Sequence, residues 1–424
     1  MARIVLACWG SYGDLFPYLA IASELRARGH DVVLCTCPYY QDIVDREGFA
    51  FRPLRPDVRP DDTALLARIM DPQRGSEVII RELIVASLRQ SYGDISAAAD
   101  GADLLLSHPI TFAAPLVAEG RGLPWVASVL APLSFFSLSD FPALPNAPQI
   151  VGVTRAVPWA ARALMALARR ITRPWMAPVV ALRAELGLPP AGDPLYEGQF
   201  SPHGNLALFS RVIGEVQPDW PARTTVTGFP FYNRAIAMPA ELAAFLDSGE
   251  PPIVFTLGSA AVNAAGRFFE ESARAAAALG RRAVLLVGQT PSNRPAALPP
   301  AVLAVESAPH DQLFPRAAVV VHQGGVGTTG QALRSGRPEL VVPFAHDQPD
   351  NAFRVQQLGA ARVLYPKRYT ADRVAAELRT LLDDGRYAVA AAEVGRRVQA
   401  EHGAATAADV ILGALKSAPA QKGV

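Results

Sequence analysis

The sequence has little cysteine and almost no net charge. Its 424 residues include 3 cysteines, two of which, Cys35 and Cys37, alternate within one predicted strand. Three thiols do not complete a four-ligand structural zinc site, so we predict that the cysteines are buried and reduced.

The net charge of the chain is also close to zero, because 40 Lys and Arg residues balance 39 Asp and Glu residues, for a formal charge of +1. This balance excludes nucleic-acid binding that is driven by overall charge.

Long apolar runs are also lacking. No run of about 20 apolar residues stays free of proline and polar breaks, as a bilayer-spanning helix would require. Residues 1–14 have only a short apolar run before Gly10, unlike a secretory signal. We therefore predict a cytoplasmic protein. Hydrophobic residues at 50% and charged residues at 19% supply enough apolar surface for large folded cores.

Short aliphatic runs alternate with amphipathic segments, which is typical of parallel strands joined by helices. The predicted strands form two series, at 4–8, 31–37, 103–107, 125–130 and 206–210, and then at 253–257, 283–287, 317–322 and 340–343. Because the series restarts, we predict an α/β fold with two Rossmann-like domains whose parallel sheets face each other across a cleft. Ligands should then lie at the carboxyl ends of strands.

The segment 224–239 contains Gly228, Pro230 and Pro239 and is the predicted hinge. We place the boundary near Ala235. This gives an N-terminal domain at 1–235, a C-terminal domain at 236–415 and a flexible tail at 416–424.

A glycine-rich turn carries the strongest functional signal. His322-Gln323-Gly324-Gly325-Val326-Gly327-Thr328-Thr329 follows an apolar strand and precedes a helical pattern. Such a helix start presents free backbone N–H groups and the positive dipole end to an anion such as a diphosphate. The hydroxyls of Thr328 and Thr329 can donate to phosphate or cap the helix, and the His322 ring can donate as well. An ordinary tight turn is the alternative. No Walker lysine follows the glycines, which disfavours a P-loop NTPase.

A second polar segment, 343–351, follows the next strand and contains Asp347 and Gln348. A carboxylate and an amide bind vicinal sugar hydroxyls by paired hydrogen bonds. A helix N-cap near Asp350 would explain one of these polar residues but not all of them. The two segments together predict a site for a sugar attached to a diphosphate.

The turn and the Asp347-Gln348-Pro349-Asp350-Asn351 segment resemble the donor signature of the family 1 nucleotide-sugar glycosyltransferases of GT-B fold. The amino end, Gly10-Ser11-Tyr12-Gly13-Asp14-Leu15-Phe16-Pro17, is similar to the bacterial branch. The middle segments 217–221 and 227–230 resemble rhamnosyltransferase chains of the rhamnolipid type. The resemblance spans residues 4 to about 382.

The resemblance implies an N-terminal acceptor domain and a C-terminal donor domain. Gly324, Gly325, Gly327 and Thr328 would hold the donor diphosphate, with help from His322, Thr329 and Ser259, and Asp347 with Gln348 would bind the sugar. Plant relatives have a glutamate for the ribose soon after the turn, whereas this chain has Gly330 and Gln331. The absence of this glutamate is compatible with a dTDP donor, and a UDP donor stays open as the alternative.

Transfer requires a base, because an acceptor hydroxyl is a poor nucleophile until its proton is removed. Asp14 is the first candidate, since it follows the first strand and stands where plant relatives have their catalytic histidine. His108 follows another strand, where those relatives have the aspartate that orients the histidine, so the pair is predicted to be inverted here. The alternative interpretations are a helix N-cap for Asp14 and a core histidine for His108.

The acceptor is predicted to be small and largely apolar, a lipid or a natural-product aglycone. Ser11, Phe135 and Phe136 are the candidate acceptor residues, and core packing is the alternative for the two phenylalanines. Residues 151–184 lack Asp and Glu and carry Arg162, Arg170 and other arginines. This pattern fits a helix pair with arginines toward water, or peripheral contact with the inner membrane.

The predicted enzyme is thus an inverting, metal-independent glycosyltransferase with no cofactor beyond the nucleotide-sugar co-substrate. In an inverting reaction one base on the acceptor side and anion binding on the donor side suffice. A nucleotide-sugar epimerase and a non-catalytic nucleotide-sugar-binding helper are the alternatives. Monomer and homodimer both stay open.

Overall fold

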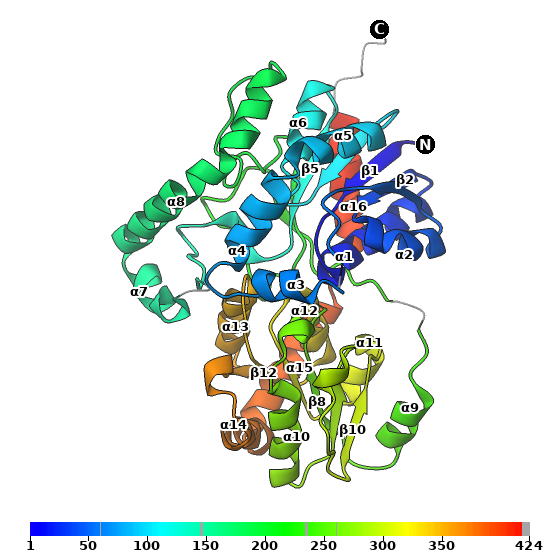
Figure 1. Ribbon diagram of the computed structural model, residues 1–424, viewed down its shortest axis with the longest axis vertical. Helices are drawn as coiled ribbons and strands as arrows, with labels where there is room; N and C mark the ends of the chain where they lie inside the picture. The colour runs from blue at the N-terminus through cyan, green and yellow to red at the C-terminus, as the bar shows by residue number, and fades with distance from the viewer. Residues whose placement is uncertain (60, 145–146, 234–235, 260, 418–424) are drawn as a thin grey trace.

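Two wholly parallel sheets form the framework of the computed structural model (Figure 1), which describes residues 1–59, 61–144, 147–233, 236–259 and 261–417. The first sheet has the order β3-β2-β1-β4-β5-β6-β7, and the second has the order β10-β9-β8-β11-β12-β13. The predicted two-domain α/β architecture is confirmed. The first sheet consists of β1 (Arg3–Ala7), β2 (Asp31–Thr36), β3 (Ala50–Pro53), β4 (Leu104–Ser107), β5 (Trp125–Val129), β6 (Asn205–Ala207) and β7 (Thr224–Val226). The second consists of β8 (Ile253–Thr256), β9 (Ala283–Leu286), β10 (Val302–Val305), β11 (Val319–His322), β12 (Glu339–Val341) and β13 (Ala361–Val363).

Helices connect the strands and cover the sheets. In the first half of the chain they are α1 (Tyr12–Ala27), α2 (Gln41–Arg46), α3 (Thr63–Ile69), α4 (Gly75–Glu77), the π-helical segment η2 (Val78–Val85), α5 (Leu88–Ala98), α6 (Ala113–Gly120), α7 (Val151–Ala156) and α8 (Pro158–Glu185). In the second half they are α9 (Ala240–Asp247), α10 (Phe268–Ala278), α11 (His310–Leu313), α12 (Val326–Ser335), α13 (Gln348–Gln357), α14 (Ala371–Asp383), α15 (Gly385–Gln399) and α16 (Gly403–Ser417).

All nine predicted strands are present, and four further strands were missed. The missed strands, β3, β7, β10 and β13, are the outer strands of the two sheets. Three of them, β3, β7 and β13, are partly exposed and lack a continuous apolar run. An edge strand has one neighbour and one open side, so its sequence need not be uniformly apolar.

The last helix corrects the predicted domain division. Although α16 follows the second sheet in sequence, it packs on the first domain against α1 and β5 (Figure 1). Its Ala407, Ala408 and Ile411 are fully buried in the core of that domain. The segment 236–415 is therefore not one unit, because the apolar side of its last helix is covered by the other domain. Lys416 and Ser417 belong to α16, while Ala235 and residues 418–424 of the predicted tail lie outside the described residues.

One hydrophobic cluster joins the two domains. Phe209 and Phe229 from the first domain pack in the same cluster as Leu333 and Val341 from the second. A Cβ added at Gly330 would lie 3.0 Å from the Phe229 ring. Glycine at 330 thus leaves room for the Phe229 ring from the opposite domain. Plant relatives are expected to have a glutamate near this position.

Residues 151–185 form the helix pair α7 and α8, as one of the two interpretations predicts. The buried side of α8 includes Met165, Met176 and Val179, whereas Trp159 is 72% exposed. Arg169 and Arg183 form ion pairs within the first domain. No helix among the described residues combines the length and the apolar character that crossing a bilayer requires. Peripheral membrane contact stays a prediction.

Candidate functional site

A carboxylate and an imidazole meet where β1 and β4 end. Oδ1 of Asp14, in the first turn of α1, lies 3.3 Å from Nε2 of His108. The backbone N–H of His108 donates to the carbonyl of Ala7 at 3.1 Å, which continues the parallel pairing of β1 with β4. The sheet thus brings together two residues that are far apart in sequence. The side chain of Asp14 is 29% exposed and that of His108 is 5% exposed, so the carboxylate is the more accessible of the two.

The second oxygen of Asp14 belongs to a capping box. Oδ2 accepts hydrogen bonds from the backbone N–H of Ser11 at 2.6 Å and from its hydroxyl at 3.0 Å. The Ser11 hydroxyl in turn accepts from the N–H of Gly13 at 3.2 Å, so Ser11 is the N-cap of α1. Asp14 is therefore the third residue of this helix and not its N-cap. Ser11 is predicted to bind the acceptor, but its backbone N–H and its hydroxyl both donate to Asp14.

The glycine-rich turn has the predicted strand–turn–helix structure. Gly324 has φ of +87°, and a Cβ there would lie 2.9 Å from Val341 and 3.1 Å from the carbonyl oxygen of Gln348. Gly325 is the N-cap of α12 and offers no capping side chain, so the first N–H groups of α12 are left for another acceptor. The turn therefore has the backbone arrangement of an anion site.

The starts of α12 and α1 face each other across the two domains. A Cβ added at Gly327 would lie 3.7 Å from the Cα of Gly13. The positive ends of two helix dipoles therefore approach one point, next to Asp14. An anion held there would lie between the glycine-rich turn and the carboxylate–imidazole pair.

His322 corrects the sequence prediction. Its ring is fully buried, Nε2 lies 2.8 Å from Oε2 of Glu339, and Nδ1 accepts from the N–H of Gly324 at 3.1 Å. Both ring nitrogens are thus bonded within the protein, and the ring has no free donor for a phosphate. Burial raises the pKa of Glu339 above its ordinary value, whereas the hydrogen bond with His322 lowers it. His322 holds the turn in shape.

The threonines of the turn differ from each other. Thr328 is buried, with 9% of its surface exposed, and its hydroxyl oxygen accepts from Nε2 of Gln323 at 3.4 Å. Thr329 is fully buried, so its predicted donation to a phosphate is not what the structure favours. Neither threonine caps α12, whose N-cap is Gly325.

Gln323 is a site residue that sequence reasoning missed. Its amide group occupies the space that a Cβ at Gly325 or at Gly258 would take. Gln323 thus lies between the turn and the loop after β8, where the exposed Ser259 lies. The only signal in the sequence was its place between His322 and two glycines.

Asp347 and Gln348 lie at the start of α13, beside the turn. Nδ2 of Asn351 donates to Oδ2 of Asp347 at 2.7 Å and to the carbonyl of Gly324 at 2.9 Å, so it ties the two predicted donor segments together. Oε1 of Gln348 accepts from the N–H groups of Phe344 and Ala345. Asp347 stands at the N-cap position of α13, but its side chain makes no capping hydrogen bond.

The carboxyl group of Asp347, in the second domain, is influenced by the charge of Asp14, in the first domain. Burial raises the pKa of Asp347 to about 7, the hydrogen bond from Asn351 opposes the change, and the charge of Asp14 adds to it. The last effect places the two carboxylates within electrostatic reach of each other. The neighbouring His346, also missed from the sequence, has φ of +58°, and burial lowers its pKa.

The predicted acceptor residues Phe135 and Phe136 pack inside the first domain. The Phe135 ring stacks on Trp220 with centroids 3.8 Å apart and belongs to the cluster that joins the domains. Phe136 packs against Tyr196 at 4.8 Å. Phe135 is buried among other aromatic side chains and leaves little surface for a ligand, whereas Phe136 is half-buried and its acceptor role stays a prediction.

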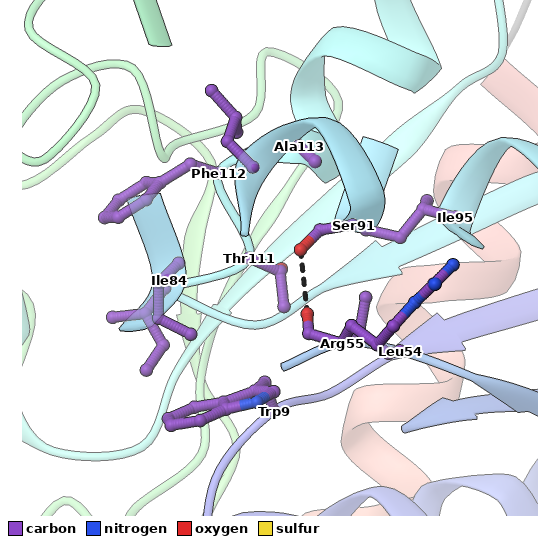
Figure 2. Close-up of a pocket in the computed structure, with 11 residues that line it drawn as sticks. Trp9, Leu54, Arg55, Ile84, Ser91, Ile95, Thr111, Phe112 and Ala113 are labelled. Atoms are coloured by element: carbon purple, nitrogen blue, oxygen red, sulfur yellow. Dashed lines mark hydrogen bonds between the residues drawn. The ribbon is translucent and has the colours of Figure 1, made fainter. Parts of the chain in front are cut away.

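A small apolar pocket is lined in part by the segment that follows His108 (Figure 2). Its lining includes Trp9, two residues after β1, and Ile110, Thr111 and Phe112, which begin two residues after His108. Thr111 donates from its hydroxyl to the carbonyl of His108 at 2.7 Å, so this wall is tied to the pair. Figure 2 shows Trp9 and Ile84 on one side of the pocket and Ser91, whose hydroxyl donates to the carbonyl of Arg55, on the other.

Two Rossmann-like domains that bring the start of α12 against the Asp14–His108 pair have the architecture of the GT-B glycosyltransferases. Comparisons with known proteins agree. Residues 4–116 match the glycosyltransferase family 28 N-terminal domain, and residues 273–411 match the erythromycin biosynthesis protein CIII-like C-terminal domain.

A similar curated protein is the O-mycaminosyltylonolide 6-deoxyallosyltransferase of Streptomyces fradiae. It is 35% identical over 422 residues, which cover 96% of each chain, so this chain belongs to the bacterial glycosyltransferase family of that relative. Among solved structures, the glycosyltransferase of kitacinnamycin has a TM-score of 0.74 at 25% identity, covering 98% of this chain and 99% of its own. The glycosyltransferase VinC in complex with dTDP shares the fold, with a TM-score of 0.68 at 21% identity and coverage of 98% and 100%.

Proposed function

We propose that the protein is an inverting glycosyltransferase that moves a sugar from a UDP or dTDP donor to a hydroxyl of a small, largely apolar acceptor. The observation that carries this proposal is the placement of the Asp14–His108 pair opposite the start of α12. The solved VinC complex contains dTDP, and the name of the Streptomyces fradiae relative describes transfer of a deoxyhexose to an already glycosylated product. A dTDP-rhamnose donor is one specific form of the proposal.

The donor diphosphate would bind at the start of α12. The free N–H groups of Val326, Gly327 and Thr328, the Thr328 hydroxyl and the Ser259 hydroxyl are the proposed donors to its oxygens. They would stabilise the negative charge that develops on the leaving diphosphate, so the step needs no metal ion. Asp347 and Gln348 would bind the sugar hydroxyls, since Asn351 holds Asp347 beside the turn.

Asp14 would act as the base. Oδ1 removes the acceptor proton while the acceptor oxygen attacks the anomeric carbon from the side opposite the diphosphate. His108 is buried behind Asp14 and would orient that oxygen and stabilise its charge. The apolar part of the acceptor would lie on the Trp9 side of the pair; the pocket of Figure 2, with a cavity volume of about 10 Å³, is itself too small to hold it.

A two-part assay tests the proposal. Thermal shifts with UDP and dTDP identify the nucleotide, because a ligand that binds only the folded protein raises its melting temperature. UDP- and dTDP-sugars are then incubated with and without hydroxylated apolar acceptors. A glycosylated acceptor with inverted anomeric configuration is the expected product. A donor epimer that forms without acceptor would instead identify an isomerase, and binding without turnover of any donor would identify a helper protein.

A further inference from the structure

Four charged side chains connect α13 to the first domain. Oδ2 of Asp350 accepts from Nε of Arg354 at 2.7 Å, and Nη1 of Arg354 donates to Oδ2 of Asp140 at 2.6 Å. The other oxygen of Asp140 lies 2.6 Å from Nη2 of Arg155, on α7. Asp350 is fully buried and Arg354 nearly so. Two negative and two positive charges thus alternate across the domain boundary.

The network also holds a segment of the first domain, residues 137–143. Oδ1 of Asp350 accepts from the backbone N–H of Ala143 at 2.8 Å, and Arg354 donates to the carbonyl of Ile213 at 2.9 Å. From the other side, Asp219 accepts from the hydroxyl of Ser137 at 2.7 Å and from the N–H of Leu138 at 2.6 Å. Segment 137–143 is therefore held at both ends, by its own domain and by the other one.

The location of the network on α13 connects it to the site. Of the proposed sugar contacts, Asp347 is the N-cap of α13 and Gln348 lies in its first turn, together with Asp350. Arg354 follows one helical turn later, on the same side as Asp350. A helix is stiff over this length, so any shift of α13 relative to segment 137–143 also shifts the sugar contacts relative to the first domain, which carries Asp14.

We propose that Asp350, Arg354 and Asp140 are positioning residues for sugar transfer, an inference that rests on the proposed function. They lock segment 137–143 onto α13 and thereby fix the distance from the donor sugar to the base on the opposite domain. Buried ion pairs add little net stability, but they tolerate few alternative arrangements, because each partner left alone is a costly buried charge. Reactions between bound groups depend strongly on such distances.

The first test needs no substrate. Asp140→Asn keeps the side-chain size and removes the charge that Arg354 and Arg155 share. Hydrogen exchange in segment 137–143 is expected to be at least about tenfold faster than in the wild-type protein, because the segment loses one of its two anchors. The matched control is Arg183→Gln, which removes a partly buried ion pair between α8 and Glu119 within the first domain. The control should leave exchange in 137–143 unchanged.

The second test separates positioning from binding. In Asp140→Asn, the dissociation constant of dTDP or UDP should stay within about twofold, while kcat/KM for the acceptor falls about tenfold. Arg354→Gln should act in the same direction, and the double variant should lose less than the product of the two single effects, because both changes break one contact. The Arg183→Gln control should keep wild-type kinetics.

Different outcomes separate the two proposals. Wild-type exchange and wild-type acceptor kinetics in a folded Asp140→Asn protein would overturn the positioning role. A loss of acceptor kinetics and nucleotide affinity in equal proportion would also overturn it, because that result indicates general damage to the second domain. A wild-type protein that binds no nucleoside diphosphate would overturn the proposed function, and hydrogen exchange would still decide whether the network anchors segment 137–143.

Discussion

Asp14 uses its two carboxylate oxygens for different partners: Oδ2 is held by Ser11 at 2.6 Å and 3.0 Å, and Oδ1 lies 3.3 Å from Nε2 of His108. The cap of α1 therefore fixes the orientation of the carboxylate before any substrate arrives. A group held in one orientation loses little entropy when it reacts. The helix-capping role and the proposed catalytic role of Asp14 support each other.

Asp14→Asn should lower the rate of transfer about a hundredfold or more, because the amide accepts no proton at neutral pH. Nucleotide affinity by calorimetry should stay near the wild-type value. The Asn amide oxygen can still accept from Ser11, so the free energy of unfolding should change by less than about 1 kcal/mol. Ser11→Ala separates the cap from the base: it weakens the cap that orients the carboxylate but keeps the carboxylate, so it should lose less activity than Asp14→Asn. Transfer at the wild-type rate in Asp14→Asn would show that another group is the base.

His108→Gln should lower transfer less than Asp14→Asn, by about tenfold, because the carboxylate stays in place and loses only its buried partner. The measurement is kcat at saturating donor and acceptor, with a thermal melt to exclude unfolding. A greater loss than that of Asp14→Asn would reverse the roles of the two residues.

His322→Ala should destabilise the protein by roughly 1–3 kcal/mol, because it leaves the buried Glu339 carboxyl without its partner. Urea unfolding measures this change. Glu339→Gln is the control: its amide oxygen still accepts from His322, so it should cost less. Nucleotide affinity should fall only as far as the turn loosens, since the ring faces Glu339. Unchanged stability with lost nucleotide binding would restore the ring as a phosphate contact.

Gly324→Ala should destabilise the folded protein by about 1–3 kcal/mol and weaken nucleotide binding, because an L side chain at φ of +87° is strained and its Cβ would meet Val341 and Gln348. Gly413→Ala is the matched control. A Cβ at Gly413, within α16, meets nothing within 4 Å, so this change should stabilise by about 0.5–1 kcal/mol. Denaturant midpoints and calorimetry with dTDP measure both effects.

The raised pKa of Asp347, to about 7, makes stability depend on pH. The folded protein holds this proton more tightly than the unfolded chain, whose Asp pKa is about 3.9. The stabilising effect of the proton is complete below pH about 4 and is lost as pH rises to about 7. Asp347→Asn has no such proton to lose, so its stability relative to wild type should rise as the pH increases across this range. Urea unfolding from pH 4 to pH 8 measures the free energy of unfolding of both proteins. If the two curves of this free energy against pH were parallel, they would contradict the raised pKa of Asp347.

The sequence was sufficient for the inner strands and the turn. The strands β1, β4, β8 and β11 are buried on both faces and carry continuous aliphatic runs, so their pattern identifies them directly. Glycines at 324 and 325 indicate the turn because few other residues fit there. The outer strands were missed because a half-exposed edge strand places weaker demands on composition.

The sequence by itself determined which chemical groups follow which strands, and therefore that Asp14, His108 and the 322–329 turn would lie at the carboxyl ends of two parallel sheets. Only the tertiary structure decided which of those groups stay free for a ligand. The side chains of His322 and Phe135 have suitable chemistry but are engaged by Glu339 and Trp220, and the side chain of Thr329 is fully buried. The contacts of Arg354 with Asp140 and of Asp350 with the N–H of Ala143 depend on how the two domains pack. Local pattern follows from short-range backbone preferences, whereas side-chain pairing across domains is set by packing among residues hundreds of positions apart.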